Sequence, residues 1–260
     1  REFKEETTLD PQLVEPVYNQ AKSYADEGLY DIAERYLIRA QQLNPDKWEI
    51  LNTMGVVRMA LHQLPHALEC LQAANKLCHN QKLILINLGL CLALSGNDAE
   101  AERIFRQAAQ VAKDDPEVNM HLGWLYMRRH SVSQAMTELQ TALSRDDKLA
   151  IAHNNCGLCE IEMGNYEEAT KHFRKALAID SEMGAVHYHI GSVHMLLKQI
   201  DMAVKEWETA AKLEATNADC LANLGVAYYK DHKIDMAVTE FRRVITLRQT
   251  RMEDFANLAL

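Results

Sequence analysis

The chain has 260 residues, of which 48% are hydrophobic and 25% are charged, as is ordinary for a soluble fold. Its formal net charge of -9 at pH 7 argues against a nucleic-acid partner, because affinity for phosphates rests on clustered Lys and Arg. The longest apolar run, Leu83 to Leu94, is shorter than the roughly 20 residues of a bilayer-spanning helix, so no membrane span is expected.

Residues 1–13 are predicted to form an N-terminal tail and the start of the first helix. Arg1 to Thr8 is charged and lacks helical periodicity. The pair Asp10-Pro11 resembles a helix N-cap followed by proline at the first helical position, and the same pair recurs as Asp115-Pro116. The first helix is therefore expected to begin near residue 10.

Beyond the tail, small residues recur at an interval of 34 residues. Gly89 sits inside an apolar run, where glycine costs a helix about 1 kcal/mol relative to alanine, so a close backbone approach is indicated there. The same phase holds Gly55, Gly89, Gly123, Gly157, Gly191 and Gly225. A second small position holds Ala33, Ala67, Ala101, Ala135, Ala169, Ala203 and Ala237. A third holds Ala40, Ala74, Ala108, Ala142, Ala176, Ala210 and, last, Val244.

Three small positions in each period let two antiparallel helices pack closely and stack on a copy of themselves. The pattern resembles the tetratricopeptide repeat family, whose helix-turn-helix unit is 34 residues long. This resemblance implies an all-α, right-handed superhelical solenoid of antiparallel helix pairs. The predicted repeats are 14–47, 48–81, 82–115, 116–149, 150–183, 184–217 and 218–251, which together span residues 14–251.

The ends of the helices can also be predicted from this numbering. The break within each pair is expected near Gly28, Gly96 and Gly164, or near His62, His130, Lys198 and His232. Residues 252–260 match the first helix of an incomplete eighth repeat. Because a solenoid end normally needs a polar cap, we expect either a fragment of a longer protein, which we favour, or a partner covering the open end.

A row of polar side chains follows the first helices, which in this family line a concave groove. The sixth position of the repeats holds Asn19, Asn87, Asn155, Asn223 and Asn257, with His121 and His189 between them. Because an amide both donates and accepts, such a row suits the backbone of an extended peptide. It resembles the asparagine ladder of the O-linked N-acetylglucosamine transferase repeats and the asparagines of the peroxisomal import receptor. The alternative is that these side chains make only local hydrogen bonds or recur by duplication.

Apolar residues occupy groove positions that would be polar in a solvated groove. We expect Leu83, Ile86, Leu90, Met120, Trp124, Met127 and Leu158 to bind apolar side chains of a peptide, with Val56, Met59, Leu94 and Ile161 beside them. A contiguous apolar patch of this kind usually marks an interface. The alternative is that the N-terminal tail or superhelical closure covers it.

Other kinds of site are not expected. The family's carboxylate clamp for chaperone tails needs lysine and asparagine at groove positions that here hold other residues. Cys156 and Cys159 form a C-x-x-C in mid-helix, where packing is the simpler explanation. His187, His189 and His194 spread around a helix, so no metal site is expected. We find no motif for a catalytic residue or a cofactor.

The sequence therefore predicts a non-enzymatic adaptor or scaffold that binds a peptide segment of a partner protein in the concave groove. Two other functions stay open: a self-assembling structural scaffold that associates through its open C-terminal end, and the recognition arm of a larger enzyme such as a glycosyltransferase. Six scattered cysteines at helix positions elsewhere filled by Leu, Val or Ala suit a reducing compartment, so a cytoplasmic location is expected.

Overall fold

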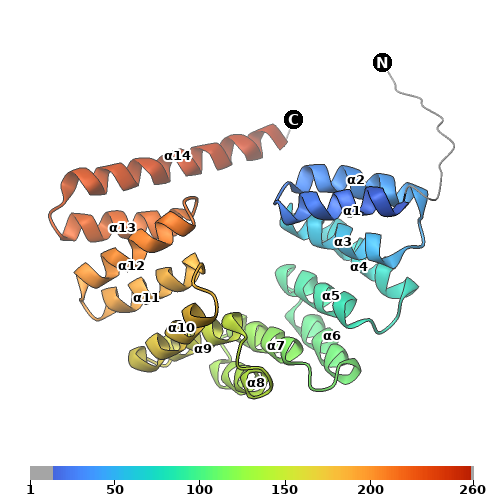
Figure 1. Cartoon of the computed structure of the whole chain (residues 1–260), viewed down its shortest axis with the longest axis horizontal. Helices are drawn as coiled ribbons and strands as arrows, with labels where there is room; N and C mark the ends of the chain where they lie inside the picture. The colour runs from blue at the N-terminus through green and yellow to red at the C-terminus, as the bar shows by residue number, and fades with distance from the viewer. Residues whose placement is uncertain (1–13, 259–260) are drawn as a thin grey trace. The chain divides into compact units, whose positions relative to one another are not determined.

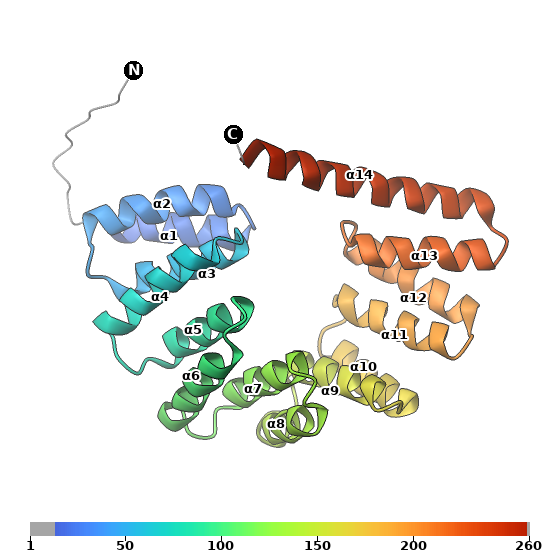
Figure 2. The same ribbon diagram turned by 180° about the vertical axis from the view of Figure 1, so that it is seen from behind.

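The computed structural model describes residues 14–258, which are all-α: fourteen helices and no strand lie within that range. The chain divides into two compact units, residues 1–131 and 132–260, which we call unit 1 and unit 2. Each described unit is a stack of antiparallel helix pairs, as Figures 1 and 2 show from opposite sides. The predicted all-α class of stacked helix pairs is confirmed.

In unit 1 each helix contacts the next one along the chain, and the first helices of successive pairs also contact one another. The helices are α1 (Val14–Asp26), α2 (Tyr30–Leu43), α3 (Trp48–Ala60), α4 (Leu64–Leu77), α5 (Lys82–Leu94), α6 (Asp98–Val111) and α7 (Pro116–Arg128). The face formed by α1, α3, α5 and α7 carries most of the side chains that the sequence proposes for binding.

Unit 2 repeats the same arrangement, and α9 and α11 contact each other as first helices do in unit 1. Its helices are α8 (Val132–Arg145), α9 (Ala150–Glu162), α10 (Tyr166–Ile179), α11 (Gly184–Leu196), α12 (Ile200–Leu213), α13 (Ala218–Lys230) and α14 (Ile234–Leu258). In Figure 1, α14 is the outermost helix of this unit and lies beside α13.

The turn within each described pair contains one residue in the left-handed region. Gly28 and Gly96 have φ of +77° and +83°, which glycine adopts without strain. Where glycine is absent, His62, His130, Lys198 and His232 take the same conformation. These are the breaks that the sequence predicts.

The glycine of the first helix is required by the large apolar side chain of the second helix. A Cβ atom added to Gly89 would lie 2.6 Å from Cε1 of Phe105, and one added to Gly157 would lie 2.4 Å from Cε1 of Phe173. Both rings are fully buried and have no room to move. The recurring glycines of the sequence therefore mark places where the backbone of a first helix contacts a large apolar side chain of the second helix.

We expect Gly89→Ala to lower the free energy of unfolding by about 1–3 kcal/mol through overpacking against Phe105. This is the opposite of the gain of about 1 kcal/mol that alanine gives in an unconstrained helix. Urea unfolding of the chain measures it, with Gln20→Ala at an exposed position of α1 as the control. A Gly89→Ala variant as stable as the parent would contradict the packing argument.

The end of the described chain differs from the expected start of an eighth repeat. Instead of breaking near residue 251, α14 continues without a turn to Leu258. Residues 248–251 contain no Gly, Pro, Asn or Asp. Such residues lie between helices in earlier repeats, where Asn44 and Pro45 follow the end of α2 and Asp115 precedes the start of α7. Without such a residue the backbone keeps its helical hydrogen bonds.

Candidate peptide-binding surfaces

Side chains at the fifth and sixth positions of adjacent repeats pair with each other in unit 1. Nδ2 of Asn87 on α5 donates to Oδ1 of Asn52 on α3 at 3.0 Å. One step earlier, the hydroxyl of Tyr18 lies 2.9 Å from Oγ1 of Thr53. The polar row therefore joins neighbouring first helices.

The same pairing recurs in unit 2. Nδ2 of Asn223 donates to the hydroxyl of Tyr188 at 3.1 Å, and Nδ1 of His189 lies 2.9 Å from Oδ1 of Asn154. Because burial lowers the pKa of His189 to about 4, its ring is neutral at pH 7. The amide oxygen can only accept, so Nδ1 of His189 is the donor.

These pairs change what the asparagines offer a ligand. An amide hydrogen of Asn87 and one of Asn223 are used within the chain, as the local alternative proposed from the sequence requires. Among described residues, none donates to Oδ1 of either side chain. Asn19 is exposed on α1 and has no partner in the described chain. The row therefore joins repeats and still offers acceptors.

Two steps of the row are apolar. Ile86 and Met120 occupy the fifth position and are buried, although the sequence placed them among the groove residues that contact a ligand. Ile86 is covered because α5 packs between α3 and α7. A side chain already buried in the free chain offers a ligand no surface.

The sixth-position side chains beside those steps are also withdrawn from solvent. His121 is half-buried and its ring stacks on Phe105 with centroids 5.8 Å apart, and burial lowers its pKa. Asn155 is buried and accepts a long hydrogen bond of 3.4 Å from Nδ2 of Asn154. Neither side chain is as open as Asn19.

The other predicted apolar residues of unit 1 remain accessible. Leu83 is 50% exposed and Leu94 is 46% exposed, both on α5, and Val56 on α3 is exposed as well. The other predicted apolar residues of this unit that are not buried are half-buried. We call the exposed and half-buried residues together the unit 1 apolar surface; its members are Val56, Met59, Leu83, Leu90, Leu94, Trp124 and Met127. It spans three first helices that contact one another in sequence, α3, α5 and α7.

Trp124 is held in place at one edge of this surface. The guanidinium of Arg128 lies over its indole, 5.3 Å from the ring centroid, and Arg128 also forms an ion pair with Asp98 at 3.6 Å. A tryptophan fixed in this way costs little entropy when a ligand packs against it. Trp124 is therefore suited to be an anchor.

A cavity of about 250 Å³ lies on the corresponding face of unit 2. It opens between α11 and α13, and is lined by Ser192, Met195, Leu196, Trp207, Asn223, Val226 and Lys230. Among these, sequence reasoning singled out Asn223 alone. Val226 was the available signal, because it is an apolar residue at the same repeat position as Leu90 and Trp124. Leu158, also predicted to bind, is half-buried against the core formed by α10 and α11.

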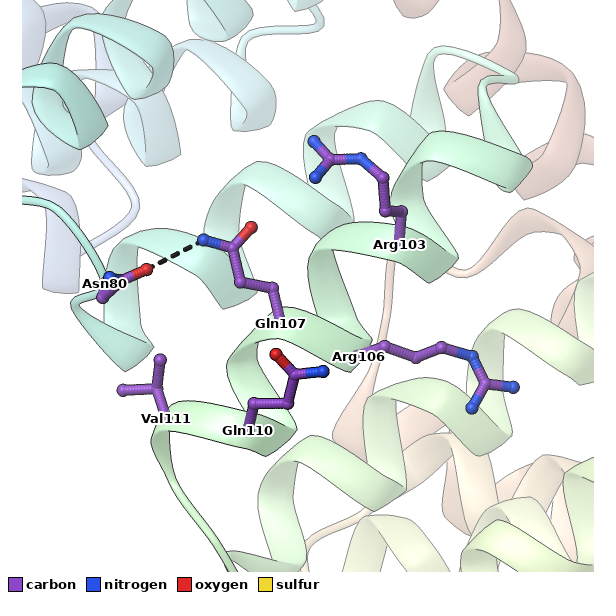
Figure 3. A pocket seen from close by; sticks show the side chains of 6 residues that line it. All are labelled: Asn80, Arg103, Arg106, Gln107, Gln110 and Val111. Atoms are coloured by element: carbon purple, nitrogen blue, oxygen red, sulfur yellow. Dashed lines mark hydrogen bonds between the residues drawn. The ribbon is translucent and has the colours of Figure 1, made fainter.

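A second kind of cavity, of about 600 Å³, lies along α6 in unit 1. Figure 3 shows Gln107 donating to Asn80 at its edge, at 2.8 Å, with Arg103 and Arg106 alongside. Both arginines are paired, Arg103 with Glu100 and Arg106 with Glu102. Their charges are therefore largely neutralised by the chain itself.

Two acidic side chains in the first turns of first helices, Glu15 and Glu117, are also paired. Nζ of Lys82 donates to Asp115 at 2.8 Å and to Glu117 at 2.9 Å, which ties the start of α5 to the start of α7. Lys47 pairs with Glu15 in the same way. These lysines therefore make contacts between adjacent repeats.

The C-x-x-C pair packs in the core. Cys156 and Cys159 are buried on α9, and burial raises their pKa values to about 12 and about 11. At pH 7 both thiols are therefore protonated and poor nucleophiles. Among the residues whose side chains the structure describes, no group of three ligand-type side chains could hold a metal. None of the described helices is long and apolar enough to cross a membrane.

Stacked antiparallel helix pairs, joined by a polar row along their first helices, define a helical-repeat protein. Family models described as tetratricopeptide repeat match residues 14–47, 86–154, 150–183 and 217–253. The chain belongs to the tetratricopeptide repeat family. The matches at 14–47 and 150–183 have the bounds of the first and fifth predicted repeats.

Curated relatives with similar sequences include two subunits of protein complexes. The anaphase-promoting complex subunit CDC16 of Saccharomyces cerevisiae is 24% identical over 66% of this chain and 21% of its own length. The BBSome complex member BBS4 of Bos taurus is 28% identical over 53% of this chain and 26% of its own length. The matched segment thus spans about a quarter or less of these relatives.

Among solved structures, the APC/C hetero-tetramer Cut9-Hcn1 has a similar fold. It superposes with a TM-score of 0.74 at 15% identity, covering 90% of this chain and 44% of that one. The similarity shows that the two proteins have the same kind of fold, a stack of helix pairs. At this identity it shows the fold alone.

Proposed function

We propose that this chain is a non-enzymatic protein-interaction scaffold that binds a peptide segment of a partner on the unit 1 apolar surface. The observation that carries the proposal is the exposure of Leu83, Leu94 and Val56 on adjacent first helices. Contiguous exposed apolar residues usually mark an interface, since water around them is released on binding. Family membership and the similarity to named complex subunits support a scaffold role.

In this proposal the apolar surface and the polar row have different tasks. Leu83, Leu90 and Trp124 would hold apolar side chains of the peptide, and Met127 would adapt to their shape. Oδ1 of Asn87 would accept an N–H from the peptide backbone while its amide nitrogen stays bonded to Asn52. The asparagines would then give orientation and the apolar residues most of the affinity.

The paired charges favour an apolar peptide over an acidic tail. Lys47 and Lys82 are engaged by carboxylates of the chain, so a carboxylate-clamp chaperone tail is not the proposed ligand. The net charge of -9 also disfavours nucleic acid. All six cysteines are free, which supports a reducing compartment such as the cytoplasm.

We expect Leu83→Glu to weaken peptide binding at least about tenfold, because it places a charge within the apolar contact. The ligand would be a peptide selected on the parent chain from a random library and measured by fluorescence anisotropy. Trp124→Ala should weaken binding by a similar factor, and Asn87→Ala by less.

Leu77→Glu is the matched control, since Leu77 is an exposed leucine of the same unit on a second helix. It should leave the affinity unchanged, and circular dichroism should show equal helicity for all variants. Equal affinities for the parent and the Leu83 and Trp124 variants would rule out this surface.

A further inference from the structure

The cavity between α11 and α13 in unit 2 is large enough for one bulky side chain. It measures about 250 Å³, less than the roughly 300–1,000 Å³ of pockets that hold drug-sized molecules. Ser192 on α11 and Val226 on α13 line it, at the repeat position where α5 and α7 carry the larger Leu90 and Trp124. The size of the cavity therefore favours a single side chain of a partner over a cofactor.

The polar hydrogens that line this cavity are already used by the chain. Oγ of Ser192 donates to the carbonyl oxygen of Tyr188 at 2.9 Å, and Nε1 of Trp207 donates to the same oxygen at 3.0 Å. Asn223 donates through Nδ2 to the hydroxyl of Tyr188, and no described group donates to its Oδ1. With Met195 in the wall, the cavity offers a ligand apolar surface and one open acceptor.

Lys230 brings a positive charge to the lining of this cavity. Its side chain is exposed, and no described carboxylate pairs with its ammonium group. Arg128, at the same repeat position on α7, pairs with Asp98 in the preceding repeat at 3.6 Å. The residue equivalent to Asp98 in the repeat before Lys230 is Ile200, which cannot neutralise a charge. A carboxylate supplied by a ligand would complete this pair.

These positions are exposed in repeats that have a further repeat behind them. Val226 is 41% exposed, and Val56, at the same repeat position of α3, is 39% exposed although α5 packs against α3. Leu94 occupies the repeat position of Lys230 on α5 and is 46% exposed although α7 contacts α5. The exposure therefore belongs to the repeat position and not to the place of α13 in the chain.

We propose that this cavity is a second binding site, which takes an apolar side chain of a partner protein next to an aspartate or glutamate. The apolar side chain fills the cavity, the main-chain N–H of the same residue donates to Oδ1 of Asn223, and the neighbouring carboxylate pairs with Lys230. The site shares no residue with the unit 1 apolar surface.

A chain-terminal carboxylate fits the cavity less well than a side-chain carboxylate. It would enter together with the apolar side chain of the same residue. There the hydroxyl of Ser192 and the indole of Trp207 have no hydrogen left to donate to it. A carboxylate on a flexible side chain can instead reach the exposed ammonium of Lys230. The proposed occupant is therefore an internal segment of the partner.

The dipeptide N-acetyl-leucyl-glutamate amide carries all three groups and is the probe. Binding is followed by NMR on the chain with isotope-labelled methionine methyl groups, because Met195 lines the cavity. We expect a saturable shift of the Met195 signal, which Met195→Leu assigns. Glutamine in place of glutamate should weaken binding about two- to fivefold, as expected for one exposed ion pair. Free N-acetylleucine, which represents a chain end, should bind less tightly than the probe.

Val226→Trp tests the cavity itself. α7 carries Trp124 at this repeat position and Val226 is 41% exposed, so the variant should keep the parental circular dichroism. The indole would occupy the cavity and should weaken binding at least about tenfold. Lys230→Glu should reverse the charge preference, so that N-acetyl-leucyl-lysine amide binds more tightly than the glutamate probe. Leu83→Glu, on the unit 1 apolar surface, should leave the Met195 shift unchanged.

Each alternative outcome contradicts a stated part of this proposal. Absence of a saturable Met195 shift, or parental affinity in Val226→Trp, overturns the site. Equal affinities for the glutamate and glutamine probes overturn the pairing with Lys230. Tighter binding of free N-acetylleucine overturns the internal segment, because the occupant is then a chain terminus. These measurements do not depend on whether the unit 1 apolar surface binds a peptide.

Discussion

Phe173→Ala should lower the free energy of unfolding by about 3–5 kcal/mol, the cost of emptying a ring-sized space in a packed core. Phe173 is fully buried on α10. Its ring lies against Gly157 of α9 and 5.6 Å, centroid to centroid, from the imidazole of His189 on α11. One side chain thus joins two helix pairs of unit 2. Urea unfolding followed by circular dichroism measures the loss.

Phe241→Ala is the matched control, because Phe241 occupies the same repeat position on α14. It packs against Gly225 but is 36% exposed, since no described helix covers its other side. We expect its replacement to cost only about 1–2 kcal/mol in the isolated chain. A loss equal to that of Phe173→Ala would mean that Phe241 is buried, which would contradict its observed exposure.

Acid should destabilise unit 2 through His189, whose pKa burial lowers from 6.5 to about 4. Between these two pH values the unfolded chain binds a proton that the folded chain excludes. The stability is fully present above pH 6.5 and is lost as the pH falls toward 4. The expected loss from this residue is about 3 kcal/mol.

His189→Asn isolates that contribution. Asparagine occupies the sixth position in other repeats, at Asn87 and Asn223, so the repeat tolerates it, and an amide can still donate to Asn154. The variant should keep its stability near pH 7 and lose less of it between pH 6.5 and 4. His153 and His172, whose pKa values burial also lowers, remain in both proteins. Equal pH dependence would show that His189 is not the source.

The sequence predicted the candidate surfaces only in part. It identified Leu83, Leu90 and Trp124 because apolar residues at groove positions are unusual wherever core packing does not require them. It placed Ile86 and Met120 with them, because periodicity gives the direction of a side chain but not how closely neighbouring helices approach. The cavity between α11 and α13 and the pairing of Asn87 with Asn52 depend on side chains from different repeats.

The sequence alone determined the helix pairs, their 34-residue interval and the turns between them. These follow from short-range constraints: a glycine facing a ring, buried alanines, and a left-handed residue at each turn. Only the tertiary structure decided which polar groups are satisfied and which apolar faces stay open. Asn223 donates a hydrogen bond to Tyr188, whereas Phe241 is partly exposed. The two differ because the burial of a side chain depends on which side chains the adjacent helix carries. A repeating pattern cannot encode that difference, because the pattern is the same in every repeat.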